Sequence, residues 1–197
     1  APVMTLLNAM PFENRRKILS ELRYGGILER LPPIVFVPHH KSHAASCFYA
    51  SGFDRGLILV MDGMGDALST SVWVGEGKTL RCIRKIGFPN SLGEYYSAFT
   101  EYLGFRPYAD EGKLMGLAAY GKRDDDLVNA VRREVLQAGQ GSYKVNSLYT
   151  VSGKHNFGER YTDALVNLFG PPRPRDSALN EHHYNLAFAV QYMLEQA

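Results

Sequence analysis

The segment from Ile34 to Asp66 constrains the fold of this chain more than any other. It reads IVFVPHHKSHAASCFYASGFDRGLILVMDGMGD, in which two aliphatic runs, residues 34–37 and 56–61, enclose histidines, small residues and aromatics. Continuous aliphatic runs of this length are typical of strands that are buried on both faces, as in a parallel sheet. The residues between the runs are enough for one crossover helix. We therefore predict a strand, a helix and a neighbouring strand in an α/β fold.

Three histidines follow the first run, and an aspartate ends the second. Pro38 suits the start of a helix because its missing N–H is not needed there. On that helix His39 and His43 share a face, so their imidazoles can converge on one ion; His40 and His43 form a second pair. Asp62, at the carboxyl end of the neighbouring strand, can supply a hard oxygen ligand. The alternative is that the histidines cap the helix and bond to backbone carbonyls.

The residues from Asp62 to Asp66 read DGMGD and form a glycine-rich turn. Glycine lets the backbone approach a phosphate closely, and the N–H groups of such a turn can form a concavity that binds anions. The candidates for nucleotide contact in this turn are Gly63, Met64 and Gly65. Asp-Gly also occurs in many hairpins for turn geometry alone. The spacing does not match the D-x-D-x-D-G pattern of a calcium loop.

The hydrophobic pattern divides the chain into three parts, which are a helical lead-in over 1–33, a sheet core over 34–88 and a mainly helical part over 89–197. The lead-in has apolar residues at helical spacing from Thr5 to Leu31, with a break at Gly25-Gly26. The sheet core ends in a predicted hairpin of strands 67–75 and 79–88 with its turn at 76–78. The last part is predicted to contain helices at about 91–103, 110–119, 122–136, 161–169 and 179–196, and a short strand at 142–145.

Several residues of the helical part are candidates for ligand contact. Ser91 and Gly93 lie at the start of a helix for which Asn90 or Ser91 is the N-cap, and free N–H groups there attract anions. The aromatic residues of that helix are predicted to be core. Asp163, at the start of helix 161–169, could face an acceptor molecule, although stabilisation of the helix dipole is the simpler account.

Composition is that of an ordinary globular protein. Of the 197 residues, 45% are hydrophobic and 21% are charged, so a packed core is feasible. The net charge is only +2 and the basic residues are scattered, which argues against a nucleic-acid surface. Cys47 and Cys82 are predicted to be reduced core residues of a cytoplasmic protein, with a disulfide as the less favoured alternative. The apolar runs are too short to span a membrane, and no signal peptide is visible.

Four blocks of sequence carry a family resemblance. HHKSHAASCFYASGF, LVMDGMGD, FPNSLGEYYSAFTEYLGF and DEGKLMGLAAYGK occur in this order between Pro38 and Lys122. Together they resemble the amino-terminal catalytic domain of the O-carbamoyltransferases, which decorate nodulation factors and antibiotics. That domain is similar to the tRNA threonylcarbamoyladenosine transferases, within the superfamily of actin, sugar kinases and heat-shock ATPases. The resemblance therefore implies a ribonuclease H-like mixed sheet with flanking helices.

The resemblance also implies roles for particular residues. His39 and His43 match the iron ligands of the family's H-x-x-x-H motif, and Asp62 matches the aspartate that helps to hold the metal and the nucleotide. The expected ion is Fe²⁺, or another divalent metal. Residues that match positions beside a bound adenylate are Gly63 and Met64 on the phosphate side and Glu111 and Lys113 at the ribose. The family forms carbamoyl-adenylate from ATP and carbamoyl phosphate in a separate domain, and then transfers the carbamoyl group to a hydroxyl.

A complete family member has more chain than is present here. It begins with strands that carry an early aspartate and histidine, and it continues into an adenosine-binding segment and an adenylate-forming domain. We therefore expect these residues to be part of an amino-terminal domain, with the rest of the same chain and a small-molecule hydroxyl acceptor as partners, but not nucleic acid or a membrane. The alternatives are threonylcarbamoyl or cysteine carbamoyl transfer, and a non-catalytic module that binds metal or nucleotide.

Overall fold

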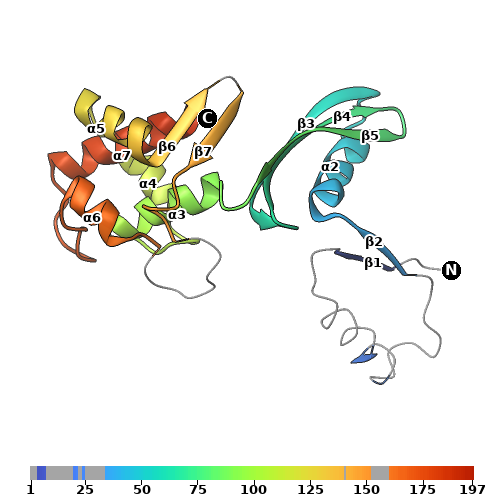
Figure 1. The fold of residues 1–197 in the computed structure, drawn as a ribbon, viewed down its shortest axis with the longest axis horizontal. Helices are drawn as coiled ribbons and strands as arrows, with labels where there is room; N and C mark the ends of the chain where they lie inside the picture. Colours follow the sequence, from blue (N-terminus) through green and yellow to red (C-terminus); the bar gives the residue numbers. More distant parts are fainter. Residues whose placement is uncertain (1–3, 8–19, 22–23, 25–33, 140, 152–159) are drawn as a thin grey trace. The chain divides into compact units, whose positions relative to one another are not determined.

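The structure is a computed structural model that describes residues 4–7, 20–21, 24, 34–139, 141–151 and 160–197. It is a mixed α/β chain, and Figure 1 traces it from the N-terminus in blue to the C-terminus in red. The chain divides into two compact units, one of residues 1–60 with 64–85 and the other of residues 61–63 with 86–197. We refer to them as the sheet unit and the helical unit.

The sheet unit contains a short parallel pair of strands. Strand β1 (Met4–Leu7) pairs with β2 (Ile34–Val37), and Met4 lies opposite Ile34. The prediction of a helix from Thr5 is therefore wrong for this strand. The segment MTLL, with three apolar residues of four, fits a strand as well as a helical turn, and the pairing with β2 decides between them. Most of the remaining predicted helical lead-in lies outside the described residues.

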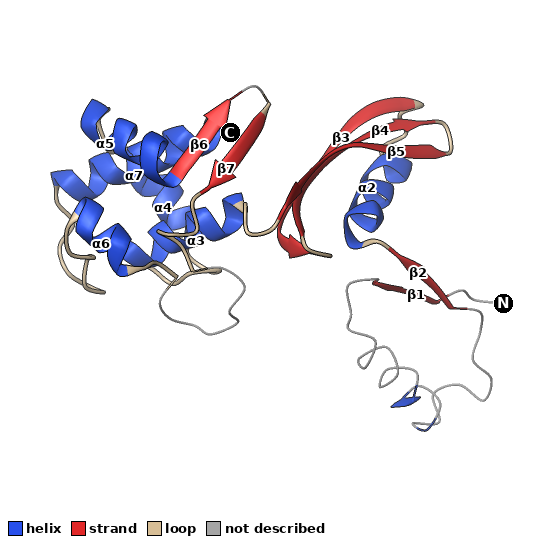
Figure 2. Cartoon of the chain, in the orientation of Figure 1, coloured by secondary structure: helices blue, strands red, loops and turns tan. Residues whose placement is uncertain are grey.

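Helix α2 (His39–Ala50) follows β2, as predicted, and packs on a sheet of three strands (Figure 2). The sheet has the order β3 (Arg55–Gly65), β4 (Leu68–Glu76) and β5 (Thr79–Gly87), which confirms the predicted hairpin. Apolar side chains from the helix and the sheet form a small core between them, which consists of Ala44, Phe48, Ile58, Val60 and Trp73.

Two predictions about β3 are wrong. Its sheet neighbour is β4, whereas β2 pairs with β1, so β2 and β3 are not adjacent strands of one sheet. The strand is also not buried on both faces, since Leu57, Leu59 and Met61 are 71%, 56% and 60% exposed while Ile58 and Val60 are buried. The reason is that α2 packs on only one face of this sheet, so an aliphatic run here alternates between core and surface. Asp62 lies within β3 and not at its end, because the strand continues to Gly65.

A tight turn joins β3 to β4. Asp66 and Ala67 have φ values of 53° and 62°, and two consecutive residues with positive φ define the type I′ turn that suits the twist of a hairpin. The turn after β4 contains Gly77, whose φ is 55°, at the position predicted from the sequence. The DGMGD segment is therefore the end of one strand and the first residue of a hairpin turn.

The helical unit contains helices α3 (Leu92–Tyr102), α4 (Glu111–Ala118), α5 (Asp125–Ala130), α6 (Asp163–Phe169) and α7 (Glu181–Glu195). Ser91 caps α3 by accepting a hydrogen bond from the Glu94 N–H at 3.2 Å, as predicted. The aromatic stripe of α3 is core, which confirms that prediction. Two of its buried tyrosines donate to backbone carbonyls, Tyr95 to Val190 at 3.0 Å and Tyr102 to Gly170 at 2.6 Å, and Tyr96 donates to the side-chain oxygen of Gln191 at 2.6 Å.

The predicted helix over 122–136 is observed over residues 125–135, and its last turn is π-helical. Helix α5 continues into a π-helical turn, η1 (Val131–Val135), and Leu136 begins strand β6 (Leu136–Gly139). This strand pairs in antiparallel register with β7 (Ser142–Val145), and Leu136 lies opposite Val145. Leu136 is extended because it belongs to this local hairpin with the strand that follows it.

The two cysteines are free thiols, but Cys47 is exposed, so its prediction as a core residue is wrong. Cys82 is half-buried and packs against the small core of the sheet unit. Among the described helices, none combines the length and the apolar character needed to cross a membrane.

Candidate metal centre

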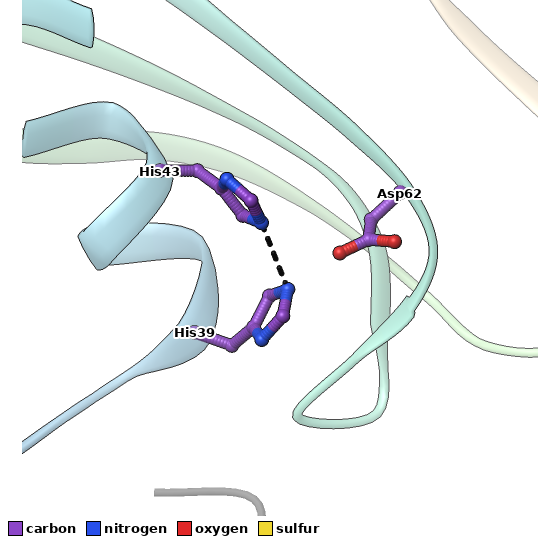
Figure 3. Close-up of side chains that lie close together, drawn as sticks. All are labelled: His39, His43 and Asp62. Carbon is purple, nitrogen blue, oxygen red and sulfur yellow. Dashed lines mark hydrogen bonds between the residues drawn. The ribbon is translucent and has the colours of Figure 1, made fainter. Parts of the chain in front are cut away.

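Three side chains that the sequence singled out converge in the structure (Figure 3). His39 and His43 project from one face of α2, and Asp62 points toward them from β3. The Nε2 atoms of the two histidines lie 2.9 Å apart, and the rings meet edge to face with centroids 4.6 Å apart. One ligand atom from each of the three residues lies within 4.8 Å of the other two. We call His39, His43 and Asp62 the triad.

The donor set and its spacing fit a divalent metal ion. Two imidazole nitrogens and one carboxylate oxygen form the set that is typical of non-haem Fe²⁺ sites, and Zn²⁺ uses the same donor types. Two metal–nitrogen bonds of about 2.1 Å at a right angle place the nitrogens about 3.0 Å apart. The observed separation of 2.9 Å is close to this value. His43 is exposed while His39 and Asp62 are half-buried, so one side of the triad is open to solvent.

The hairpin leaves room for the ring of His39 because residue 65 is glycine. A β-carbon on Gly65 would lie 2.3 Å from Cδ2 and 2.9 Å from Cγ of His39. Such distances are far inside van der Waals contact, so a side chain at position 65 would displace the imidazole. The glycine that suggested phosphate binding in the sequence therefore has a packing role beside the triad. Nucleotide contact by Gly65 stays a prediction.

The second proposed pair, His40 with His43, does not form. His40 is 1% exposed and turns away from the triad toward the sheet. Its Nε2 lies 3.2 Å from the carbonyl oxygen of Leu68, and its Nδ1 lies 2.8 Å from Oγ of Ser71, which also accepts a hydrogen bond from the indole of Trp73 at 2.7 Å. A carbonyl can only accept, so in the neutral ring Nε2 carries the proton and Nδ1 accepts from Ser71. The alternative role, bonding to a backbone carbonyl, is correct for this histidine.

Three of the predicted nucleotide contacts lie close together. A β-carbon on Gly93 would stand 3.5 Å from Cα of Gly63 and 3.6 Å from Oγ of Ser91. Gly63 belongs to the same compact unit as Ser91 and Gly93. The backbone of β3 just after Asp62 thus lies against the first turn of α3, whose N–H groups can attract an anion. Met64 is 46% exposed on the same strand.

The other predicted contacts lie on α4 and α6. Glu111 accepts hydrogen bonds at one carboxylate oxygen, from the Ser97 hydroxyl at 2.7 Å and from the Tyr108 N–H. Lys113 is exposed and pairs with Asp110, whose carboxylate lies 2.9 Å from its Nζ. Asp163 is an exposed residue in the first turn of α6, where it complements the helix dipole. The structure therefore places Glu111 and Lys113 on one helix start and Asp163 on another.

One protein family matches almost the whole chain. The model described as carbamoyltransferase N-terminus matches residues 11–197. The protein therefore belongs to the carbamoyltransferase N-terminus family, as the four sequence blocks predicted.

Curated proteins of several bacteria are also similar to parts of this chain. An uncharacterized protein of Synechocystis sp. is 39% identical over 170 residues, which is 84% of this chain and 27% of that protein. Nodulation protein NolNO of Sinorhizobium fredii is 46% identical over 88 residues, covering 45% of this chain and 13% of the relative. Nodulation protein NolO of Bradyrhizobium diazoefficiens is 44% identical over 88 residues, covering 44% and 16%. The chain thus spans about a quarter or less of the length of these curated relatives.

Proposed function

We propose that this chain is the part of a carbamoyltransferase in which a carbamoyl group passes to a hydroxyl of a small-molecule acceptor. The observation that carries the proposal is the convergence of two imidazoles and a carboxylate, all within 4.8 Å, in a chain of the carbamoyltransferase N-terminus family. We further propose that the complete domain has the fold of actin, the sugar kinases and the heat-shock ATPases. Free cysteines, one of them exposed, support a cytoplasmic location.

The proposed donor is carbamoyl-adenylate, made from ATP and carbamoyl phosphate elsewhere in the whole protein. The acceptor oxygen forms a bond to the carbamoyl carbon, and the bond from that carbon to the phosphate oxygen breaks. AMP leaves with the electron pair, and the hydroxyl proton passes to a base or to solvent. A divalent ion on the triad, with Fe²⁺ as the expected metal, would polarise the carbamoyl carbonyl as a Lewis acid.

The chain's own residues would position this donor. The contact of Gly63 with the first turn of α3 supports a phosphate position there, because no side chain at 63 or 93 stands between the backbone and the ligand. We assign the ribose to Glu111 and Lys113 and the acceptor to the neighbourhood of Asp163. The assignment of Glu111 and Lys113 rests on the fourth sequence block of the family, and that of Asp163 on its exposed position at the start of α6.

Metal content tests the triad directly. The purified protein is loaded with Fe²⁺ without oxygen, desalted and analysed for bound metal. We expect about one equivalent in the wild type and in His182→Ala, which removes an exposed histidine from α7, because ordinary surface imidazoles do not hold an ion through desalting. His43→Ala should lose the ion. Equal metal content in His43→Ala and the wild type would refute the ligand assignment.

Activity separates an enzyme from a binding module. The whole protein is supplied with ATP, labelled carbamoyl phosphate and a panel of hydroxyl acceptors, and label in the acceptor is measured. We expect transfer that requires ATP and that is lost in His43→Ala. A protein that binds one ion but labels no hydroxyl acceptor would be the non-catalytic module, and label found only on tRNA or on a cysteine would identify one of the other carbamoyl transfers.

A further inference from the structure

The helical unit contains a pocket that the proposed transfer chemistry does not use. It has a volume of about 610 Å³ and lies between the segment after α3, residues 104–109, and residues 173 and 175 in the loop before α7. Small-molecule sites in proteins usually have volumes of about 300 to 1,000 Å³. No residue of the triad lines this pocket. It is therefore a second candidate site with its own chemistry.

Three arginines give the pocket its charge. Arg106, Arg173 and Arg175 all line it, and among the described residues none of the three guanidinium groups forms an ion pair with a carboxylate. Arg173 is held in place by neutral carbonyls, because its Nη1 donates to Leu103 at 2.7 Å and its Nε donates to Ser177 at 3.1 Å. A guanidinium fork matches the geometry of a phosphate or a carboxylate, so three of them around one cavity favour an anionic ligand.

Two aromatic rings form fixed, flat walls. The Tyr108 hydroxyl donates to both carboxylate oxygens of the buried Glu94, at 2.8 and 2.9 Å, and the guanidinium of Arg160 lies over its ring, 4.5 Å from the centroid. Burial, and then the hydrogen bond and charge of Glu94, raise the pKa of Tyr108 to about 12, so this hydroxyl stays a donor. The Phe105 ring lies 5.3 Å from the guanidinium carbon of Arg173. Both rings can cover the apolar part of a ligand.

One carboxylate also lines the pocket. Glu101 accepts a hydrogen bond from the backbone N–H of Arg160, so its position is fixed by the main chain. Its negative charge disfavours phosphate on its own side of the cavity and favours a group that donates hydrogen bonds, such as a hydroxyl. The pocket thus combines a cationic part, a hydrogen-bond acceptor and flat apolar walls.

We propose that this pocket binds a hydroxylated organic phosphate, of the size of a sugar phosphate. The phosphate lies between Arg106 and Arg175 with Arg173 behind it, and the ligand's hydroxyls face Glu101. A neutral sugar lacks the group that the arginines recognise, and inorganic phosphate lacks the sugar ring whose hydroxyls would reach Glu101 and whose apolar face would lie on the aromatic rings. Binding should therefore follow the order organic phosphate, inorganic phosphate, neutral sugar.

Calorimetric titration of the purified protein with ribose 5-phosphate, inorganic phosphate and ribose tests this order. The double variant R106A/R175A removes two exposed arginines of the pocket, and R132A/R133A removes two exposed arginines of η1 as a control with the same change in net charge. We expect R106A/R175A to weaken binding of ribose 5-phosphate at least about tenfold, because charge-assisted hydrogen bonds are lost. The control should stay within about twofold.

Equal weakening in both double variants would show attraction to net charge alone and would overturn the proposal. Absence of saturable binding to the wild type would overturn it as well, as would equal affinity for ribose and its phosphate. A second measurement needs no variant: amide resonances of residues 104–109 should shift on titration with ribose 5-phosphate, and shifts confined to other segments would contradict the site. Loss of metal in His43→Ala should leave each of these results unchanged. The pocket proposal and the metal-site proposal are therefore tested independently.

Discussion

The carboxylate of Asp66 accepts a hydrogen bond from the backbone N–H of His39, although the two residues are 27 positions apart. Helix α2 needs this bond because its N-cap residue is Pro38, which offers no side-chain cap. A carboxylate at that end also complements the positive end of the helix dipole. The turn between β3 and β4 therefore holds the start of the helix that carries both histidines of the triad.

Asp66→Ala should destabilise the protein by about 1 kcal/mol, the usual effect of losing an N-cap acceptor. It should also weaken metal binding, because the first turn of α2 is then free to fray. Unfolding in urea and a metal titration measure the two effects. Asp54→Ala, at an exposed position before β3, is the matched control and should change neither quantity. Identical behaviour of the two variants would contradict a capping role for Asp66.

Gly65→Ala should weaken metal binding roughly tenfold or more, an effect typical of a displaced ligand. The new methyl group would occupy the space of the His39 ring, which must rotate away from His43. Gly63→Ala is the control on the same strand, since a β-carbon there meets nothing within 4 Å. Metal titration of both variants decides the matter, and equal affinities would show that the His39 ring adapts without cost.

Gly75→Ala should destabilise the protein by about 1 to 3 kcal/mol, the range expected for overpacking a core. A β-carbon on Gly75 would lie 2.6 Å from the ring of Phe48, which packs α2 on the sheet. Gly56→Ala approaches the same ring at 3.7 Å, an ordinary contact, and should cost much less. Comparison of the two urea midpoints tests whether this glycine sets the distance between helix and sheet.

Acidification should destabilise the start of α7 through His183. Asn180 and His183 form a capping box in which His183 Nδ1 accepts from the Asn180 N–H at 3.1 Å. Burial, and then the charges of His182 and Arg173, lower the pKa of His183 below its ordinary value of 6.5. The unfolded chain therefore takes up the proton first as the pH falls below that value, so this contribution to stability is present at neutral pH and is lost in acid.

The expected loss is less than about 1 kcal/mol, because one cap of a partly exposed helix start is involved. The measurement is the difference in urea midpoint between about pH 7.5 and about pH 5, a range in which imidazole titrates. His183→Gln keeps a hydrogen-bond acceptor without a titrating ring, so it should reduce this difference. His182→Gln should reduce it less, because it removes only the smaller, electrostatic contribution of His182 and leaves the burial of His183 unchanged. A larger pH effect in His183→Gln than in the wild type would show that the sign is wrong.

Local pattern was enough to predict much of this protein. The proline at 38 and the spacing of His39 and His43 predicted a helix with both imidazoles on one face, since neighbours on a helix surface are fixed by its 3.6-residue period. The turn at Gly77 and the cap at Ser91 also depend on residues close in sequence. The four blocks predicted the family, which the comparison confirmed over residues 11–197.

Contacts between residues that are distant in sequence decided which side chains are buried and which of them meet. Whether an aliphatic strand is covered on one face or two depends on what packs against it, and for β3 only one face is covered by α2, so Leu59 is exposed. His40 and His43 look equivalent in the sequence, but Ser71 and the Leu68 carbonyl hold His40 in the core. The sequence determined which side chains share a helix face. Only the tertiary structure brought Asp62 to that face and set Asp66 at the helix start, because those contacts depend on how the hairpin packs against α2.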